Sequence, residues 1–107
     1  MRKSVSNLVR KFPVEEKFRL ADQIIRSSHS VAANIAEGFG RFHYQENIQF
    51  CRQARGSLSE TLEHLICAFD EGFIDQKTFE EYQAMIARCL KLLNGYIAYL
   101  KKAKNNQ

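Results

Sequence analysis

The sequence contains little of the material from which turns and hairpins are built, with one proline and five glycines among 107 residues. Tight turns between strands depend on these residues, so the composition disfavours a strand-rich fold. The longest apolar runs span only about four residues, whereas a bilayer-spanning helix needs roughly 20. Charged and polar residues directly after Met1 exclude a secretory signal. We therefore expect a cytoplasmic protein with no membrane contact.

Cysteine is also scarce. Cys51, Cys67 and Cys89 lie far apart, their number is odd, and none forms a Cys-x-x-Cys pair. Each falls on an apolar face of a predicted helix. This usage predicts reduced thiols within the core and neither a disulfide framework nor a metal site.

No catalytic constellation occurs in the sequence. Ser57 lacks the pattern of a nucleophile elbow, and Gly38-Phe39-Gly40 lacks the Lys-Ser/Thr that completes a phosphate-binding loop. Glu60 and His64 are spaced one residue too far for the Glu-x-x-His element of a di-iron bundle, and no second copy exists. We expect no enzyme, no metal, no cofactor and no small-molecule substrate.

What the sequence does contain is helical periodicity over one domain, residues 1–107. Apolar residues make up 45% of the chain and recur every third or fourth position, which predicts helices over 4–12, 14–37, 44–71 and 76–102. Pro13 ends the first helix, because the residue before proline avoids the α region. Asp75 is a plausible N-cap of the last helix. These elements predict an all-α fold, an antiparallel up-down four-helix bundle whose first helix is short.

Glycines carry two further expectations. Gly38 and Gly40 interrupt the apolar rhythm of the second helix, where glycine accepts the left-handed backbone that closes helices. Gly56 lies within the third helix, where a glycine commonly marks a close contact with a neighbouring backbone.

One motif carries a family resemblance. Residues 26–41 read Arg-Ser-Ser-His-Ser-Val-Ala-Ala-Asn-Ile-Ala-Glu-Gly-Phe-Gly-Arg, and this stretch resembles the signature of the four-helix bundle proteins encoded in intervening sequences of large-subunit ribosomal RNA. Phe12-Pro13-x-Glu15-Glu16-x-Phe18, Gly56-Ser57-Leu58-Ser59-Glu60 and Gly72-Phe73-Ile74 extend the resemblance. Two departures are Ala32, where the family commonly has proline, and a first helix shorter than is usual.

The resemblance implies a small cytoplasmic bacterial bundle that assembles as a five-fold ring and has no established enzymatic activity. A more distant resemblance is to the accessory protein of diversity-generating retroelements, a basic barrel that binds nucleic acid and a reverse transcriptase. Neither resemblance supplies catalytic residues.

Within the motif, Asn34 and Glu37 share one helical face. They form either a polar site at the mouth of the bundle or a structural tie that bonds exposed backbone N–H groups of the turn, and we favour the tie. Gly38 and Gly40 argue against a helical pair between Glu37 and Arg41. Arg41 is therefore the residue best suited to an external partner, through a phosphate or a carboxylate of a neighbouring subunit.

The net charge of +4 is concentrated at the two termini. If the ends meet, they form one positive patch for RNA or DNA, and otherwise they are solvated ends. The candidate nucleic-acid contacts are Arg2, Lys3, Arg10, Lys11, Lys101, Lys102 and Lys104.

Aromatic residues cluster near the ends of the predicted helices. A small bundle does not bury all of them, and aromatic residues are enriched in the centres of interfaces. The candidate oligomer contacts are Phe39, Phe42, Tyr44, Phe50 and Phe73. The sequence therefore predicts a non-enzymatic, ring-forming structural or interaction module, with the pentamer implied by resemblance. The alternative is a nucleic-acid-binding accessory protein that uses its basic termini.

Overall fold

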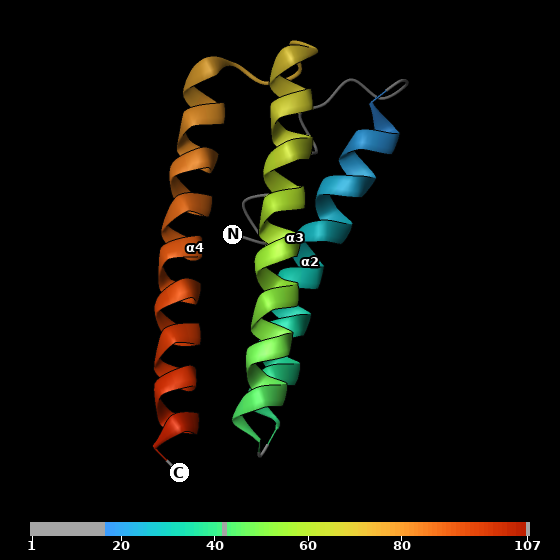
Figure 1. The fold of residues 1–107 in the computed structure, drawn as a ribbon. Helices are drawn as coiled ribbons and strands as arrows, with labels where there is room; N and C mark the ends of the chain where they lie inside the picture. Colours follow the sequence, from blue (N-terminus) through green and yellow to red (C-terminus); the bar gives the residue numbers. More distant parts are fainter. Residues whose placement is uncertain (1–16, 42, 107) are drawn as a thin grey trace.

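A computed structural model describes residues 17–41 and 43–106 of the chain. These residues form three α-helices and no strand: α2 over Phe18–Phe39, α3 over Tyr44–Asp70 and α4 over Gln76–Asn105 (Figure 1). The expected all-α class is confirmed. The molecule is elongated, with extents of 53 × 21 × 18 Å.

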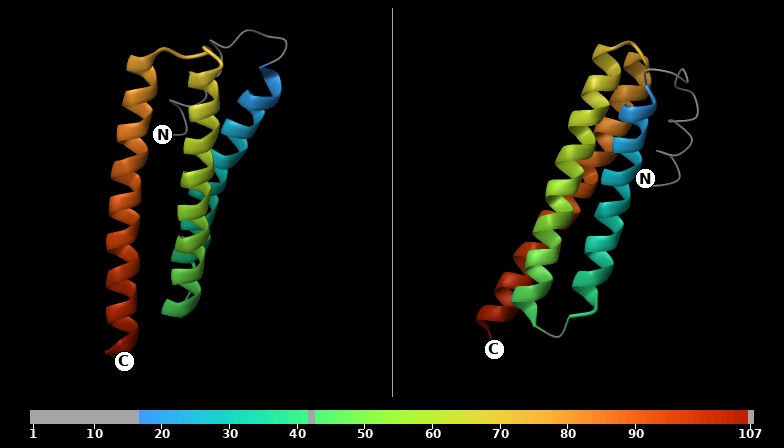
Figure 2. Two further views of the ribbon diagram at one scale, coloured as in Figure 1. Left: turned by 45° about the horizontal axis from the view of Figure 1, so that its top comes forward. Right: turned by 90° about the vertical axis from the view of Figure 1, so that its right-hand side faces the viewer.

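Helix α3 lies in the middle of the assembly. Helices α2 and α4 run antiparallel to it, and each packs along it (Figure 2). The upper end of α2 leans away from α4 (Figure 1), and the two outer helices do not pack against each other along their length. They meet near the lower end, where the ring centroids of Phe39 and Tyr96 are 5.4 Å apart. One side of α3 therefore lies between α2 and α4, where these two helices do not pack against each other.

The expected four-helix bundle is wrong for the described residues, which form three helices. The helix predicted over 4–12 lies outside the described residues, as do residues 14–16 of the next one. A nine-residue helix would extend about 14 Å, whereas the 30 residues of α4 extend about 45 Å. The other predictions differ from the structure at their ends: α2 continues to Phe39, α3 ends at Asp70 and α4 continues to Asn105.

The core lies where the three helices meet along α3. Its largest fully buried side chains come from all three helices: Ile24 from α2, Ile48, Leu58 and Leu65 from α3, and Ile86 and Leu100 from α4. The apolar positions that recur every third or fourth residue along α3 are all buried or pack against this core: Ile48, Cys51, Ala54, Leu58, Leu62, Leu65 and Phe69. Phe18, the first apolar position of the corresponding pattern in α2, is instead largely exposed.

The connection from α3 to α4 follows local sequence rules. Gly72 has φ of 77°, a left-handed conformation that glycine adopts without steric cost. The Phe73 N–H reaches back to the Ala68 carbonyl at 2.9 Å, which satisfies a carbonyl at the end of α3. Asp75 Oδ1 accepts from the Thr78 N–H at 2.7 Å. The predicted N-cap is confirmed.

Two expectations for glycine are wrong. Gly40 closes α2 with φ of −78°, in the right-handed region, and Gly38 lies within α2. What Gly38 provides is space, since a Cβ there would lie 2.6 Å from Asn47 Oδ1 and 3.2 Å from Phe50 Cβ. A Cβ added at Gly56 meets nothing within 4 Å. The close approach occurs where α2 meets the start of α3, because that is where the two helices converge toward their short connection.

Candidate interaction surfaces

The turn after α2 is held by Arg41. Its NH2 donates to Glu37 Oε2 at 3.1 Å, its NH1 lies 3.9 Å from Glu46 Oε2, and its guanidinium stacks over the Phe50 ring at 4.9 Å. The expectation that Gly38 and Gly40 keep Glu37 and Arg41 apart is wrong, because the backbone stays near helical at Gly40. The positive charge of Arg41 is therefore paired with carboxylates of its own chain, those of Glu37 and Glu46.

Asn34 turns back into α2. Its Nδ2 donates to the Ser30 carbonyl at 2.9 Å and lies 3.2 Å from Ser30 Oγ. The Asn34 amide therefore bonds its own helix and not the backbone of the turn, so the favoured structural tie is not formed by Asn34. The polar site at the mouth of the bundle stays a prediction. Asn34 bonds Ser30, four positions before it, whereas Glu37 pairs with Arg41, four positions after it.

The interface between α2 and α3 contains a seam of hydroxyl groups beside the buried apolar side chains of α2, Ala21, Ile24 and Val31. Thr61 Oγ1 donates to Ser27 Oγ at 2.8 Å, and Ser30 Oγ lies 2.9 Å from Ser57 Oγ. Small side chains allow the two helices to approach closely, and each hydroxyl then finds a partner across the seam. Among the described residues no buried side-chain nitrogen or oxygen lacks a hydrogen bond.

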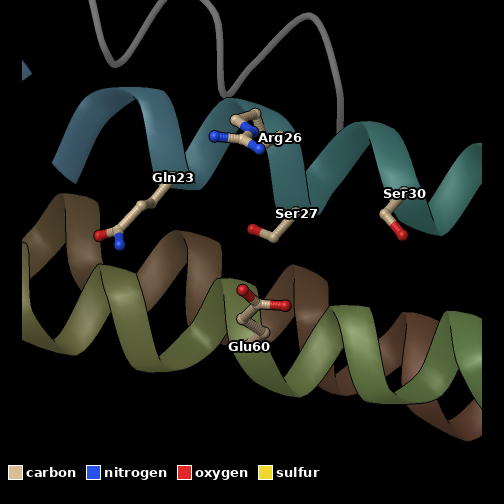
Figure 3. A pocket seen from close by; sticks show the side chains of 5 residues that line it. All are labelled: Gln23, Arg26, Ser27, Ser30 and Glu60. Atoms are coloured by element: carbon tan, nitrogen blue, oxygen red, sulfur yellow. The ribbon is translucent and has the colours of Figure 1, made fainter. Parts of the chain in front are cut away.

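A pocket of about 420 Å³ opens along this hydroxyl seam, lined by Gln23, Arg26, Ser27, Ser30 and Glu60. Figure 3 shows Glu60 rising from α3 toward α2, with Gln23, Ser27 and Ser30 on the facing side of α2. Its two charged residues have partners on their own helices: Arg26 NH1 lies 3.5 Å from Asp22 Oδ2, and Glu60 Oε1 lies 3.4 Å from His64 Nε2. The pocket leaves no buried polar group for a ligand to satisfy.

An apolar groove of about 270 Å³ lies on another side of the molecule, between α2 and α4. Leu58 of α3 forms part of it. The groove is lined by Val31, Ile35, Phe39, Leu58, Cys89, Leu92, Leu93 and Tyr96. It exists because α2 and α4 both pack on α3 without packing on each other.

Beside the groove, α4 carries a second row of apolar residues, distinct from the row that faces α3. We call it the apolar stripe: Met85, Cys89, Leu92, Tyr96 and Tyr99. Its members are spaced by four, three, four and three residues, as in the seam of a coiled coil. Leu92 is 75% exposed and Tyr99 is 62% exposed. Cys89 and Tyr96 also pack against the core, so the exposed part of the stripe is centred on Leu92 and Tyr99.

The aromatic residues predicted as oligomer contacts have different environments. Phe39 is 64% exposed and contacts the Tyr96 ring. Tyr44 and Phe73 are partly buried against the core, and Phe50 lies beneath Arg41, while Phe42 is outside the described residues. Leu92 and Tyr99 were missed, although the spacing of the apolar stripe on α4 was a signal available in the sequence.

Of the predicted basic contacts, Arg2, Lys3, Arg10 and Lys11 lie outside the described residues. Lys101, Lys102 and Lys104 are exposed in the last turns of α4, and Lys104 Nζ donates to Gln45 Oε1 at 2.7 Å. The structure adds two cations that the sequence did not single out. Arg52 and Arg55 lie on α3, and Arg55 NH1 donates to Asn94 Oδ1 of α4 at 2.8 Å.

The three cysteines are free but differ in burial. Cys51 is buried, and this desolvation raises the pKa of its thiol. Cys67 is exposed, so the expectation of three core thiols is wrong at that position. The described part of the chain contains no group of three or more His, Cys, Asp or Glu able to hold a metal ion. None of its helices is long and apolar enough to span a bilayer.

Residues 1–95 match the sequence model of a family described as 23S rRNA-intervening sequence protein. The chain belongs to this family. The match takes in α2, α3 and most of α4. It includes the hydroxyl seam, the groove except for Tyr96, and three of the five residues of the apolar stripe. The resemblance carried by residues 26–41 is thereby confirmed at the level of the family.

A solved structure agrees with this assignment. It is the crystal structure, at 1.70 Å resolution, of a protein of unknown function from the S23 ribosomal protein family of Bacteroides thetaiotaomicron VPI-5482. The two chains share 26% identity over 90% of each, with a TM-score of 0.83. No curated protein matches the chain.

Proposed function

We propose that this member of the 23S rRNA-intervening sequence protein family is a non-enzymatic structural module that associates with further copies of itself. The observation that carries the proposal is the apolar stripe of α4 with the groove beside it. Leu92 is the most exposed large apolar residue of the described chain, and it also lines the groove.

A second copy suits this surface because the stripe of one copy can pack head to tail against the α2 side of the groove of the next, lined by Val31, Ile35 and Phe39. Contiguous exposed apolar surface marks interaction sites, and a coiled-coil spacing supplies both side chains that project and the gaps that receive them. Where such a contact repeats by a rotation that closes, it gives a ring. The five-fold ring implied by resemblance is the particular assembly we expect, in the cytoplasm. The distant resemblance to retroelement accessory proteins stays a prediction.

The test is the mass of the full chain by light scattering coupled to size exclusion. We expect a mass several times 12.4 kDa at micromolar concentration. Leu92→Glu places a charge in the centre of the stripe and should give a monomer, because an unpaired charge is costly to bury. Ala87→Glu is the matched control: it adds the same charge to an exposed position of α4 outside the stripe, and should leave the assembly intact.

A wild-type mass of 12.4 kDa across that concentration range would overturn the proposal. If the wild type were such a monomer and Leu92→Glu abolished its cooperative unfolding, we would conclude that another segment of the same chain occupies the groove. An assembly that survives Leu92→Glu would place the contact on another surface.

A further inference from the structure

Charge is separated along the molecule. From Glu60 to Glu81, around the α3–α4 connection, there are seven acidic residues and a single lysine. From Tyr82 to Asn106 there are five Lys or Arg residues and no acidic residue. On the neighbouring part of α3, residues 44–59, Arg52 and Arg55 face only one acid, Glu46, which lies near Arg41.

Two contacts between α3 and α4 gather these cations on one side. The hydrogen bonds Arg55–Asn94 and Lys104–Gln45 fix the register of the antiparallel helices. Arg52 is three positions from Arg55, while Lys91 and Lys101 are three and seven positions from Asn94, so they share those faces. We call this surface the basic flank: Arg52, Arg55, Lys91, Lys101 and Lys104.

Two cations of the basic flank, Arg55 and Lys104, are held in place without being neutralised. Arg55 and Lys104 donate to the uncharged amides of Asn94 and Gln45. No ion pair involves a residue of the basic flank anywhere in residues 17–41 and 43–106. The contrast is with Arg26 and Arg41, which have carboxylate partners. A row of cations without counter-charges, two of them held in place, favours a polyanion.

We propose that the basic flank binds the phosphodiester backbone of a nucleic acid. Lys91 and Lys104 are about 20 Å apart along α4 at 1.5 Å per residue. That length spans roughly six phosphates of one strand of a duplex, at about 3.4 Å each. The planar fork of each arginine matches two phosphate oxygens. Binding through phosphates positions the chain without reading base sequence.

A nucleic acid suits the flank better than an anionic membrane does. Helices that lie in a membrane interface place large apolar residues next to their cations, whereas Asn94 and Ala98 separate Lys91 from Lys101 here. The large exposed residues Leu92 and Tyr99 belong to the apolar stripe, on the side of α4 toward α2. The basic flank is therefore separate from the surface proposed for self-association, and the two proposals fail independently.

The test is fluorescence anisotropy of a labelled RNA and of a DNA duplex, each about 20 nucleotides long, titrated with the full chain over a series of salt concentrations. The variant Arg52→Gln/Arg55→Gln/Lys101→Gln removes three charges from the basic flank. The matched control Arg19→Gln/Arg26→Gln/Lys77→Gln removes three charges from elsewhere. Both lower the net charge of +4 by the same amount.

For the wild type we expect affinity that falls linearly on a log–log plot against salt. Each lost phosphate contact lowers the slope by about 0.7 on a single strand, so the flank variant should lose about 2 from its slope and on the order of 100-fold in affinity at 0.1 M salt. The control should stay within a few-fold of wild type. Homopolymers of different bases should bind within a few-fold of one another.

Three results would overturn the proposal. The first is no binding by the wild-type chain at low salt. The second is an equal loss in the control variant, which would show that net charge acts without a defined surface. The third is tighter binding to vesicles of phosphatidylcholine and phosphatidylserine than to either nucleic acid. Light scattering on both variants completes the test, since a flank variant that dissociates would assign the flank to contacts with the acidic end of a second copy.

Discussion

The two interfaces that α3 makes are built from different chemistry. Toward α2, α3 presents Ser57 and Thr61, which pair with Ser30 and Ser27. Toward α4, large aliphatic side chains meet, and Ile86, Leu93, Ile97 and Leu100 are the buried residues of α4. In the first interface, the hydrogen bonds between hydroxyl groups hold the two helices close together and in register. Each buried hydroxyl needs a partner there, because a buried polar group without a hydrogen bond is costly. The second gains mostly apolar burial, about 25 cal/mol per Å².

This difference teaches what each outer helix contributes. A buried hydroxyl contributes little in net terms, because its partner in the unfolded chain is water. An aliphatic side chain contributes in proportion to the area it removes from water. We therefore expect α4 to contribute more to the stability than α2 does, while hydrogen bonds align both outer helices with α3. Three experiments measure this contrast, all at one protein concentration, because self-association shifts apparent stability.

The largest effect is expected in the α3–α4 interface. Leu93→Ala should lower the free energy of unfolding by roughly 2–5 kcal/mol, because it removes a buried side chain and leaves a cavity. Denaturant unfolding followed by circular dichroism measures it. Leu92→Ala, one position away and largely exposed, is the control and should cost far less in the monomer. Similar costs for the two would mean that the aliphatic interface is not where α4 gains its stability.

A smaller effect is expected at the lower end of the α2–α3 interface. Gly38→Ala should cost about 1–3 kcal/mol through overpacking, since its Cβ would meet Asn47 and Phe50. Asn47 yields only at a cost, because it donates to the Tyr96 hydroxyl at 3.0 Å. Gly56→Ala is the matched control: it meets nothing and should stabilise the protein by about 0.5–1 kcal/mol. Thermal or urea melts of equal midpoint would refute the close approach at Gly38.

The smallest effect is expected from the hydroxyl seam itself. Thr61→Val removes the donor to Ser27 and should cost about 0.5–1.5 kcal/mol. Adding Ser27→Ala should then cost less than Ser27→Ala costs alone, because the Ser27 hydroxyl has already lost Thr61 as a partner and keeps only its bond to the Ile24 carbonyl, at 3.2 Å. A double-mutant cycle over both positions measures the pairing energy. Strictly additive losses would show that the seam is held by shape alone.

Periodicity was sufficient to predict the all-α class and the apolar face of each described helix. A helix that buries one face has apolar residues at intervals of about 3.6 positions. The N-cap at Asp75 could also be predicted, because the N–H that it accepts belongs to Thr78, only three residues away. The number of helices could not. The sequence predicted a further, short helix over residues 4–12 beside three long ones, and that segment lies outside the described residues.

The surfaces were harder to predict because they depend on how helices pair. In the helical pattern of residues 76–102, either Cys89 or Leu90 and either Tyr96 or Ile97 fits the same seam. The sequence therefore did not separate the apolar stripe from the row facing α3. Arg55 and Asn94 are 39 residues apart and meet only once α3 and α4 are antiparallel. The position of Gly38 against Asn47 likewise arises from the convergence of α2 on α3.

Helix α3 is the only described helix that touches both of its neighbours along their length. Each of those contacts joins segments adjacent in the chain, linked by short connections, so loops close cheaply. Such low contact order is typical of proteins that fold within microseconds to milliseconds. Folding can therefore begin with either helical hairpin, α2–α3 or α3–α4, because both contain α3. Whichever hairpin forms first then provides the surface on which the third helix packs.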